Sequence, residues 1–167
     1  MNYSELKRLL PGVSSPSNVY YRLVNADYAS EMDEITHTIL YSWRYNPKGE
    51  FGVLYLSISI ECAYMEKLKQ VYGRKQDLLP QVVGVFRVNL TKCLDLMNSS
   101  LRKKIGISMK QLVEPSDFSF TQSIAREARN LGFEAIIAPS AIGEDCGTLV
   151  VFKDKLNPPS YCILDKE

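Results

Sequence analysis

The sequence predicts a single domain of the α+β class, spanning residues 1–167, with helices packed on a mixed, largely antiparallel sheet. Its length of 167 residues fits one domain. Apolar residues make up 46% of the chain and charged residues 23%, which is usual for a globular protein. Strand-like segments outnumber strand–helix–strand units, and the predicted helices gather between them. This pattern favours α+β over a doubly wound parallel sheet.

The first third of the chain predicts short elements separated by turns. Residues 4–10 form a predicted amphipathic helix that a Pro-Gly pair ends. Residues 19–24 are rich in β-branched and aromatic side chains and predict a strand. Residues 25–40 are poorly periodic and indicate one helical turn or a further strand. The Asn-Pro-Lys-Gly sequence at 46–49 predicts a turn before a second strand, residues 51–56.

A helix is predicted over residues 59–72, with Ser59 as its N-cap. Its predicted core stripe is Ile60, Tyr64, Leu68 and Val71. Glu66 falls on the flank, between Cys62 and Ala63 in angle, where two small neighbours leave the carboxylate approachable.

The second half predicts three further strands and several helices. Residues 82–89 lie in a nearly apolar run that predicts a buried strand, and residues 94–96 continue the connection after it. A helix is predicted over residues 119–131, with Gly132 as its left-handed terminal residue. The remaining elements are two short helices within 97–113 that break near Ile105-Gly106, strands at 134–138 and 148–152, a loop at Pro139-Ser140-Ala141, and an extended tail after Pro158-Pro159.

Charge and cysteine usage exclude several classes of protein. The net charge is +1, which argues against a dedicated nucleic-acid binder, and no segment approaches eighteen apolar residues, so no membrane span is expected. The four cysteines lack metal-ligand spacing and His37 is the one histidine, which makes a zinc site improbable. A basic cluster is interpreted as solvated surface: Arg102, Lys103, Lys104 and Lys110. The sequence therefore predicts a cytoplasmic protein whose cysteines are free thiols. His37 is interpreted as a partly exposed residue of a loop or strand.

Three residue types suited to a charged, ring-containing ligand recur at intervals of eleven: Arg44, Tyr55 and Glu66. Arginine presents a planar fork that matches phosphate, tyrosine a flat face, and glutamate a charge that stabilises a developing cation. Structural alternatives stay open for each charged candidate. Arg22 fits an outward-facing strand residue, Arg44 a surface residue stacked on a neighbouring aromatic ring, and Glu66 a solvated carboxylate.

The chain resembles the RES-domain proteins, the toxin half of a class of bacterial toxin–antitoxin pairs. The matching segments are Tyr21-Arg22, the Arg-Tyr-Asn-Pro-Lys-Gly turn at 44–49, the block from Val53 to Glu66, Leu94-Asp95-Leu96, and Gly132 to Ile136 with Pro139-Ser140-Ala141. Together they span about residues 19 to 152. The resemblance implies a fold similar to ADP-ribosyltransferases and cleavage of the nicotinamide–ribose bond of NAD by water, phosphate or a protein side chain.

The resemblance also implies the site residues and the partners. Glu66 stabilises the oxocarbenium-like transition state or grips the ribose hydroxyls, Arg22 and Arg44 bind phosphate groups, and Tyr55 packs on the nicotinamide ring. Ser140 hydrogen-bonds the ribose or phosphate. NAD is then the substrate, phosphate a candidate co-substrate, and no metal is expected. The implied protein partner is an antitoxin with an Xre-like helix-turn-helix domain; a homo-oligomer stays open. A protein ADP-ribosyltransferase and a catalytically inactive binding module of the same fold are the alternatives.

Overall fold

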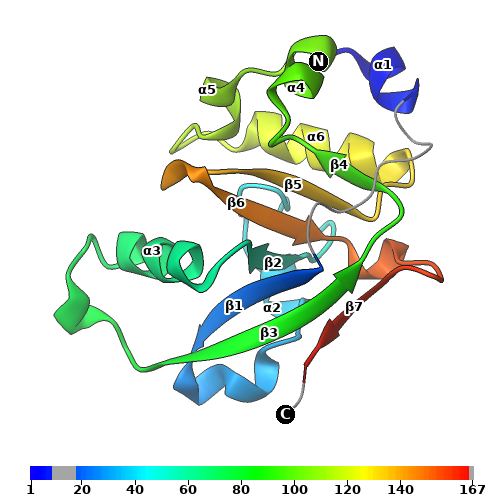
Figure 1. Ribbon diagram of the computed structural model, residues 1–167. Helices are drawn as coiled ribbons and strands as arrows, with labels where there is room; N and C mark the ends of the chain where they lie inside the picture. Colours follow the sequence, from blue (N-terminus) through cyan, green and yellow to red (C-terminus); the bar gives the residue numbers. More distant parts are fainter. Residues whose placement is uncertain (9–17, 166–167) are drawn as a thin grey trace.

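A computed structural model describes residues 1–8 and 18–165 as helices packed against one seven-stranded sheet (Figure 1). The strand order is β4-β5-β6-β2-β1-β3-β7. The strands are β1 (Val19–Asn25), β2 (Leu54–Ser57), β3 (Gln81–Asn89), β4 (Cys93–Asp95), β5 (Ala135–Ser140), β6 (Gly143–Val151) and β7 (Tyr161–Leu164). The helices are α1 (Tyr3–Arg8), α2 (Thr36–Ile39), α3 (Ile60–Gln70), α4 (Ser99–Ile105), α5 (Met109–Leu112) and α6 (Ser119–Asn130), with 3-10 turns at η1 (Ala26–Glu31), η2 (Lys75–Asp77) and η3 (Lys153–Lys155).

The sheet is antiparallel except where β4 and β5 pair in parallel. Its weakest seam lies between β1 and β2, which pair at a single position, Tyr21 with Ser57. In Figure 1 the strands on either side of this seam diverge, so that β1 and β3 run below β6 and β5. The sheet therefore has two halves, and α3 begins at Ile60, three positions after the seam residue Ser57.

Each face of the β5–β6 hairpin covers a separate hydrophobic core. Alternate residues Ile136 and Val150 enter a core beneath α1, α4, α5 and α6, which gather over β4 and β5 in Figure 1. Their neighbours Ile137 and Leu149 enter a second core, which is shared with Phe86 of β3. Strands buried on both faces require near-continuous apolar sequence, and β5 is buried at every position.

The fold class and most elements agree with the sequence prediction. The α+β class and the mixed, largely antiparallel sheet are confirmed. The break at Gly106 and the end of α6 at Gly132 are also confirmed, because both glycines adopt the left-handed conformation, with φ of +73° and +86°. Residues 25–40 form η1 and α2, and the tail forms β7 along the edge of β3. Leu9 to Gly12, part of the predicted first helix and its end, lie outside the described residues.

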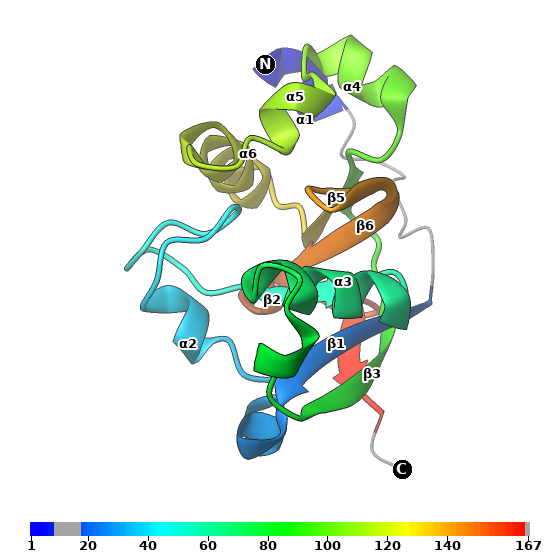
Figure 2. The same cartoon turned by 90° about the vertical axis from the view of Figure 1, so that its left-hand side faces the viewer.

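Three predictions about local structure were wrong. Residues 93–95 form strand β4 instead of a connection, because they pair with β5. Ser140 belongs to the end of β5 instead of a loop. In α3 the buried residues are Cys62 and Ala63, whereas Ile60 of the predicted core stripe is 43% exposed. The helix turns its small residues inward because it covers the sheet closely in front of β1 and β2 (Figure 2).

The expectation of four free thiols was also wrong. Cys62 and Cys146 form a disulfide, while Cys93 and Cys162 are free and buried. The bonded cysteines are 84 residues apart, and only the tertiary fold brings α3 to the first half of β6. Within the described ranges, no helix is long and apolar enough to cross a membrane, and no group of three or more His, Cys, Asp or Glu could hold a metal ion.

Candidate active site at the end of the central strands

The register of the sheet sets one residue from each of four strands in a row near the start of α3. Ser57 pairs with Tyr21 on one side and with Thr148 on the other, and Thr148 pairs with Ala138. Ser140 lies two residues beyond Ala138 at the end of β5. This row therefore brings the end of β5 and the seam of the sheet to the same side of the molecule as the start of α3.

Glu66 and Ser140 are in direct contact at this position. The Ser140 hydroxyl donates a hydrogen bond to Oε1 of Glu66 and accepts one from the Ile142 backbone N–H at 3.2 Å. Ser140 is 6% exposed and Glu66 is half-buried, so the carboxylate is oriented by the protein and still reaches solvent. A carboxylate fixed in this way can stabilise positive charge that develops on a bound substrate.

Local features of α3 place Glu66 at this contact. The Ser59 hydroxyl caps the helix by accepting a hydrogen bond from the Cys62 N–H at 3.1 Å, as predicted. Cys62 lies one helical turn before Glu66, on the inward face with Ala63, and its disulfide ties the helix to β6. The carboxylate is thus carried by a helix that is tied covalently to β6 one turn before it.

Tyr55 belongs to the same face of the sheet as Ser140, but its hydroxyl has a structural function. Tyr55 and Ser57 alternate with the core residues Leu54 and Leu56, so they point to the opposite face. The Tyr55 hydroxyl donates to Oδ1 of Asn46 at 2.9 Å and accepts from the Tyr45 N–H at 2.9 Å. Burial raises the pKa of Tyr55, which keeps the phenol neutral.

Arg44 connects the turn at residues 44–49 to the α5–α6 segment. Its Nη1 donates to the backbone carbonyls of Leu112 at 2.9 Å and Glu114 at 2.7 Å. Its guanidinium lies 4.9 Å from the centre of the Phe118 ring, so the aromatic partner is Phe118 and not the adjacent Trp43 or Tyr45. Arg44 is half-buried, and these contacts fix one side of its fork.

Arg22 lies on the same side of β1 as the buried residues Tyr20 and Val24, because side chains two positions apart in a strand share a face. It points to their side of the strand, where its Nη1 donates to the carbonyls of Met32 at 2.7 Å and Glu34 at 3.3 Å. Burial lowers the pKa of Arg22, and the nearby Asp33 charge opposes that shift.

Lys67 is a residue of this region that the sequence reasoning missed. It follows Glu66 on α3, which packs on β1, and it is half-buried. Burial and the positive charge of Arg22 lower the pKa of Lys67. Within residues 1–8 and 18–165 no carboxylate forms an ion pair with it. Arg22 and Lys67 are thus neighbouring cations that share no counterion, which suits an anionic ligand. Sequence reasoning missed this pair because only the packing of α3 on β1 brings the two residues close together.

The structure brings two of the five predicted residues, Glu66 and Ser140, into direct contact, whereas the two arginines are bonded to backbone carbonyls of other segments. Glu66 touches Ser140, and Tyr55 shares their side of the sheet. Arg22 points to the other face of β1, and Arg44 is bonded to the α5–α6 segment. A separate surface hollow of about 430 Å³ lies between α4 and α5, and none of the five lines it. That all five side chains contact one ligand stays a prediction.

The fold and this site define an α+β domain with an oriented carboxylate at the end of strand β5 and a half-buried lysine beside it in α3. The chain belongs to the RES domain family, whose model matches residues 19–162. It is 34% identical over 110 residues to a Mycobacterium tuberculosis protein named "Probable NAD(+) phosphorylase", and the match covers 65% of this chain. The chain spans about half the length of that relative, 52%.

A solved structure has the same fold. A chain of the Mycobacterium tuberculosis MbcT–MbcA toxin–antitoxin complex superimposes with a TM-score of 0.71, with 98% of this chain and 89% of that chain covered. The two sequences are 18% identical, so this likeness supports the fold alone.

Proposed function

We propose that this protein cleaves NAD at the nicotinamide–ribose bond, with phosphate or water as the acceptor. The observation that carries the proposal is the contact between Glu66 and Ser140 at the end of strand β5. Membership of the RES domain family and the name of the mycobacterial relative support the same chemistry.

The proposed reaction needs charge stabilisation more than proton transfer. Nicotinamide is positively charged in NAD and leaves as a neutral molecule with the electron pair of the broken C–N bond. The ribose carbon then resembles an oxocarbenium ion, as in glycoside cleavage. Glu66 stabilises this cation, and the Ser140 hydroxyl holds the carboxylate in position by donating to it. A phosphate oxygen then forms the new bond to the same carbon, or a water oxygen does so and its extra proton passes to solvent.

The cations beside α3 and the turn at residues 44–49 supply the binding contacts in this proposal. Arg22 and Lys67 attract the pyrophosphate of NAD or the acceptor phosphate, while Arg44 offers the part of its fork not held by Leu112 and Glu114. Tyr55 contributes its ring face to the nicotinamide end, since its hydroxyl is already bonded to the turn. No metal takes part in the proposed reaction.

Nicotinamide release by the purified protein tests the proposal. Incubation with NAD is followed with and without inorganic phosphate, and the second product is analysed by mass. We expect nicotinamide release and, with phosphate present, ADP-ribose carrying a phosphate on the anomeric carbon. Plain ADP-ribose identifies water as the acceptor, and ADP-ribose covalently attached to protein identifies an ADP-ribosyltransferase. Absence of nicotinamide release under all conditions contradicts the proposal and favours an inactive binding module.

We also propose that the protein acts in the cytoplasm as the toxin of a toxin–antitoxin pair. Cytoplasmic NAD depletion would arrest growth, and the MbcT–MbcA fold match shows that this fold occurs in such a complex. The expected partner carries an Xre-like helix-turn-helix domain. Induced expression of this chain should lower cellular NAD, and co-expression of a neighbouring helix-turn-helix protein should restore it. Growth arrest with unchanged NAD would contradict this part of the proposal.

A further inference from the structure

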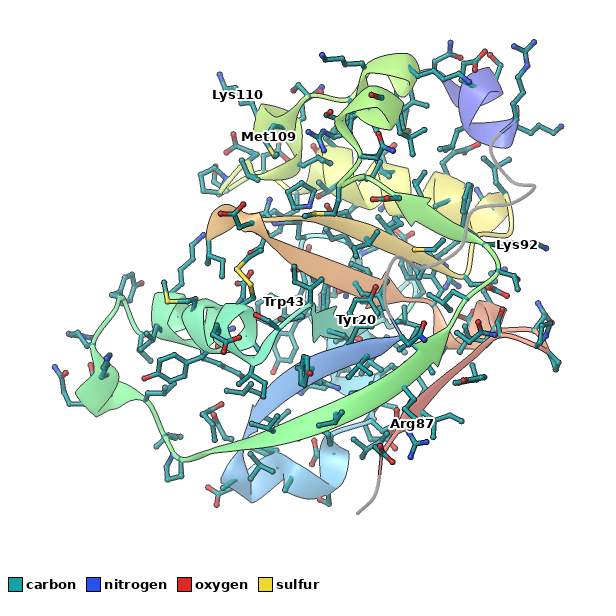
Figure 3. The ribbon with its side chains drawn as sticks, viewed as in Figure 1. Tyr20, Trp43, Arg87, Lys92, Met109 and Lys110 are labelled. Carbon is teal, nitrogen blue, oxygen red and sulfur yellow. A yellow bond between two sulfur atoms is a disulfide. The ribbon has the colours of Figure 1, made fainter. Side chains whose placement is uncertain are left out.

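We propose that the Cys62–Cys146 disulfide is a redox-dependent clamp that holds Glu66 in its active position, so that the oxidised protein is active and the reduced protein is impaired. The effect on activity rests on the function proposed above. The effect on the attachment of α3 is independent of it. The proposal concerns the only disulfide among the described residues, which is visible between α3 and the β5–β6 hairpin in Figure 3.

The disulfide and the proposed catalytic contact join the same two elements. Cys62 and Glu66 are four residues apart on α3, one helical turn along the same face. Cys146 lies in β6, whose hairpin partner β5 carries Ser140. The covalent link and the Glu66–Ser140 hydrogen bond are therefore successive connections between α3 and this hairpin.

Helix α3 packs on β1 and β2, but few of its side chains are fully buried there. Cys62 and Ala63 are its buried residues, whereas Ile60 and Met65 are 43% and 49% exposed. At its far end the Lys69 ammonium lies 3.4 Å from the Ala141 carbonyl, an exposed contact at the limit of hydrogen bonding. Helices in proteins are held mainly by the burial of an apolar face, and this helix buries a narrow one. Loss of the covalent link should therefore loosen the turn that carries Glu66.

The exchange chemistry balances with a dithiol as reductant. A reductant thiolate attacks Sγ of Cys146, which is half-buried and more accessible than Cys62, at 7% exposure. The Sγ–Sγ bond breaks, the Cys62 thiolate leaves and takes up a proton, and the second reductant thiol resolves the mixed disulfide. Two electrons and two protons pass to the protein, and the dithiol becomes a disulfide. In a reducing cytoplasm, protein disulfides are usually transient and redox-sensing, which fits a clamp that closes on oxidation.

The decisive experiment measures nicotinamide release by oxidised and dithiol-treated protein, with alkylation and mass analysis to count thiols. We expect reduction to lower kcat by roughly tenfold to a hundredfold, because small displacements of a catalytic group have effects of this size. The double variant Cys62→Ser with Cys146→Ser should have the low rate with or without dithiol. The matched control Cys162→Ala removes a free buried cysteine and should keep the full response to dithiol. A reduced protein with unchanged or increased kcat overturns the proposal.

Amide hydrogen exchange provides a readout that needs no catalysis. On reduction, the amides of α3 should exchange faster while those of α6, which buries several residues of its own, stay protected. If oxidised wild type releases no nicotinamide, the proposed function fails, and the exchange data alone decide whether the clamp exists. Equal exchange of α3 in the oxidised and reduced protein refutes the clamp whatever the activity.

Discussion

Replacement of Glu66 by glutamine is the sharpest test of the proposed mechanism. Glutamine keeps the side-chain length and the Oε1 acceptor that bonds the Ser140 hydroxyl, and it removes the charge. Loss of one electrostatic contact made to a transition state typically costs about 3 kcal/mol, which corresponds to roughly a hundredfold in kcat. The same change should leave stability within about 0.5 kcal/mol, because Glu66 is half-buried and its hydrogen bond to Ser140 survives.

The assay follows nicotinamide release at several NAD concentrations, with thermal melting of each variant as a check on folding. We expect kcat to fall and KM to change little, because the charge opposes a cation that exists only in the transition state. Glu61→Gln is the matched control, since Glu61 lies on the same helix, is exposed, and undergoes the same chemical change. Its kcat should equal that of wild type.

The outcome that refutes the reasoning is specific. If Glu66→Gln releases nicotinamide at the wild-type rate, Glu66 is not the catalytic carboxylate, whatever its contact with Ser140. If Glu61→Gln loses as much activity as Glu66→Gln, the effect belongs to the charge of α3 as a whole and not to the position of one side chain.

Three further predictions use other contacts. Arg44→Lys should lower the free energy of unfolding in urea by about 1–2 kcal/mol, because lysine cannot stack a flat group on Phe118 while also bonding two carbonyls. The same variant should raise KM for NAD, and an unchanged unfolding midpoint would contradict the structural role of Arg44. Burial and the charge of Arg22 lower the pKa of Lys67, so as the pH rises Lys67 loses its positive charge below the ordinary pKa of 10.5. The KM for NAD should therefore rise with pH in wild type, and rise less in Lys67→Arg, because arginine stays charged. The same pH profile of KM in both proteins would show that Lys67 does not bind NAD. Glu134→Ala should cost about 2–3 kcal/mol in the same unfolding assay, since it leaves two buried backbone N–H groups and the Ser160 hydroxyl without their acceptor; unchanged stability would refute that role.

The elements that could be predicted from sequence are those with a local cause. The breaks at Gly106 and Gly132 follow from the one residue that adopts positive φ without steric cost, and the cap at Ser59 from a side chain that bonds its own helix. Strand β4 has no such signal. It is three residues long, and its partner β5 begins 42 positions after it does, so its pairing is a tertiary event.

The error in the core face of α3 has a related cause. A helical wheel ranks positions by hydrophobicity, and Ile60 outranks Ala63 on any such scale. The helix lies close to the sheet at the start of the site, however, and proximity there selects small side chains over large ones. The disulfide of Cys62 is invisible to sequence for the same reason, because no local spacing marks a partner 84 residues away.

The candidate site shows how much of a function can be dispersed in a sequence. Glu66 and Ser140 are 74 positions apart, and they meet because Ser57 sits at the only pairing of β1 with β2 and also pairs with Thr148 of β6. After Ser57 the chain leaves the sheet at that seam and forms α3, which therefore lies beside the end of β5, where Ser140 is. A one-residue slip of β2 against β6 would carry Tyr55 to the opposite face and shift α3 by about 3.3 Å along the sheet, which would separate the carboxylate from the hydroxyl. The chemistry of this site therefore depends on strand register at least as much as on the identity of the residues that line it.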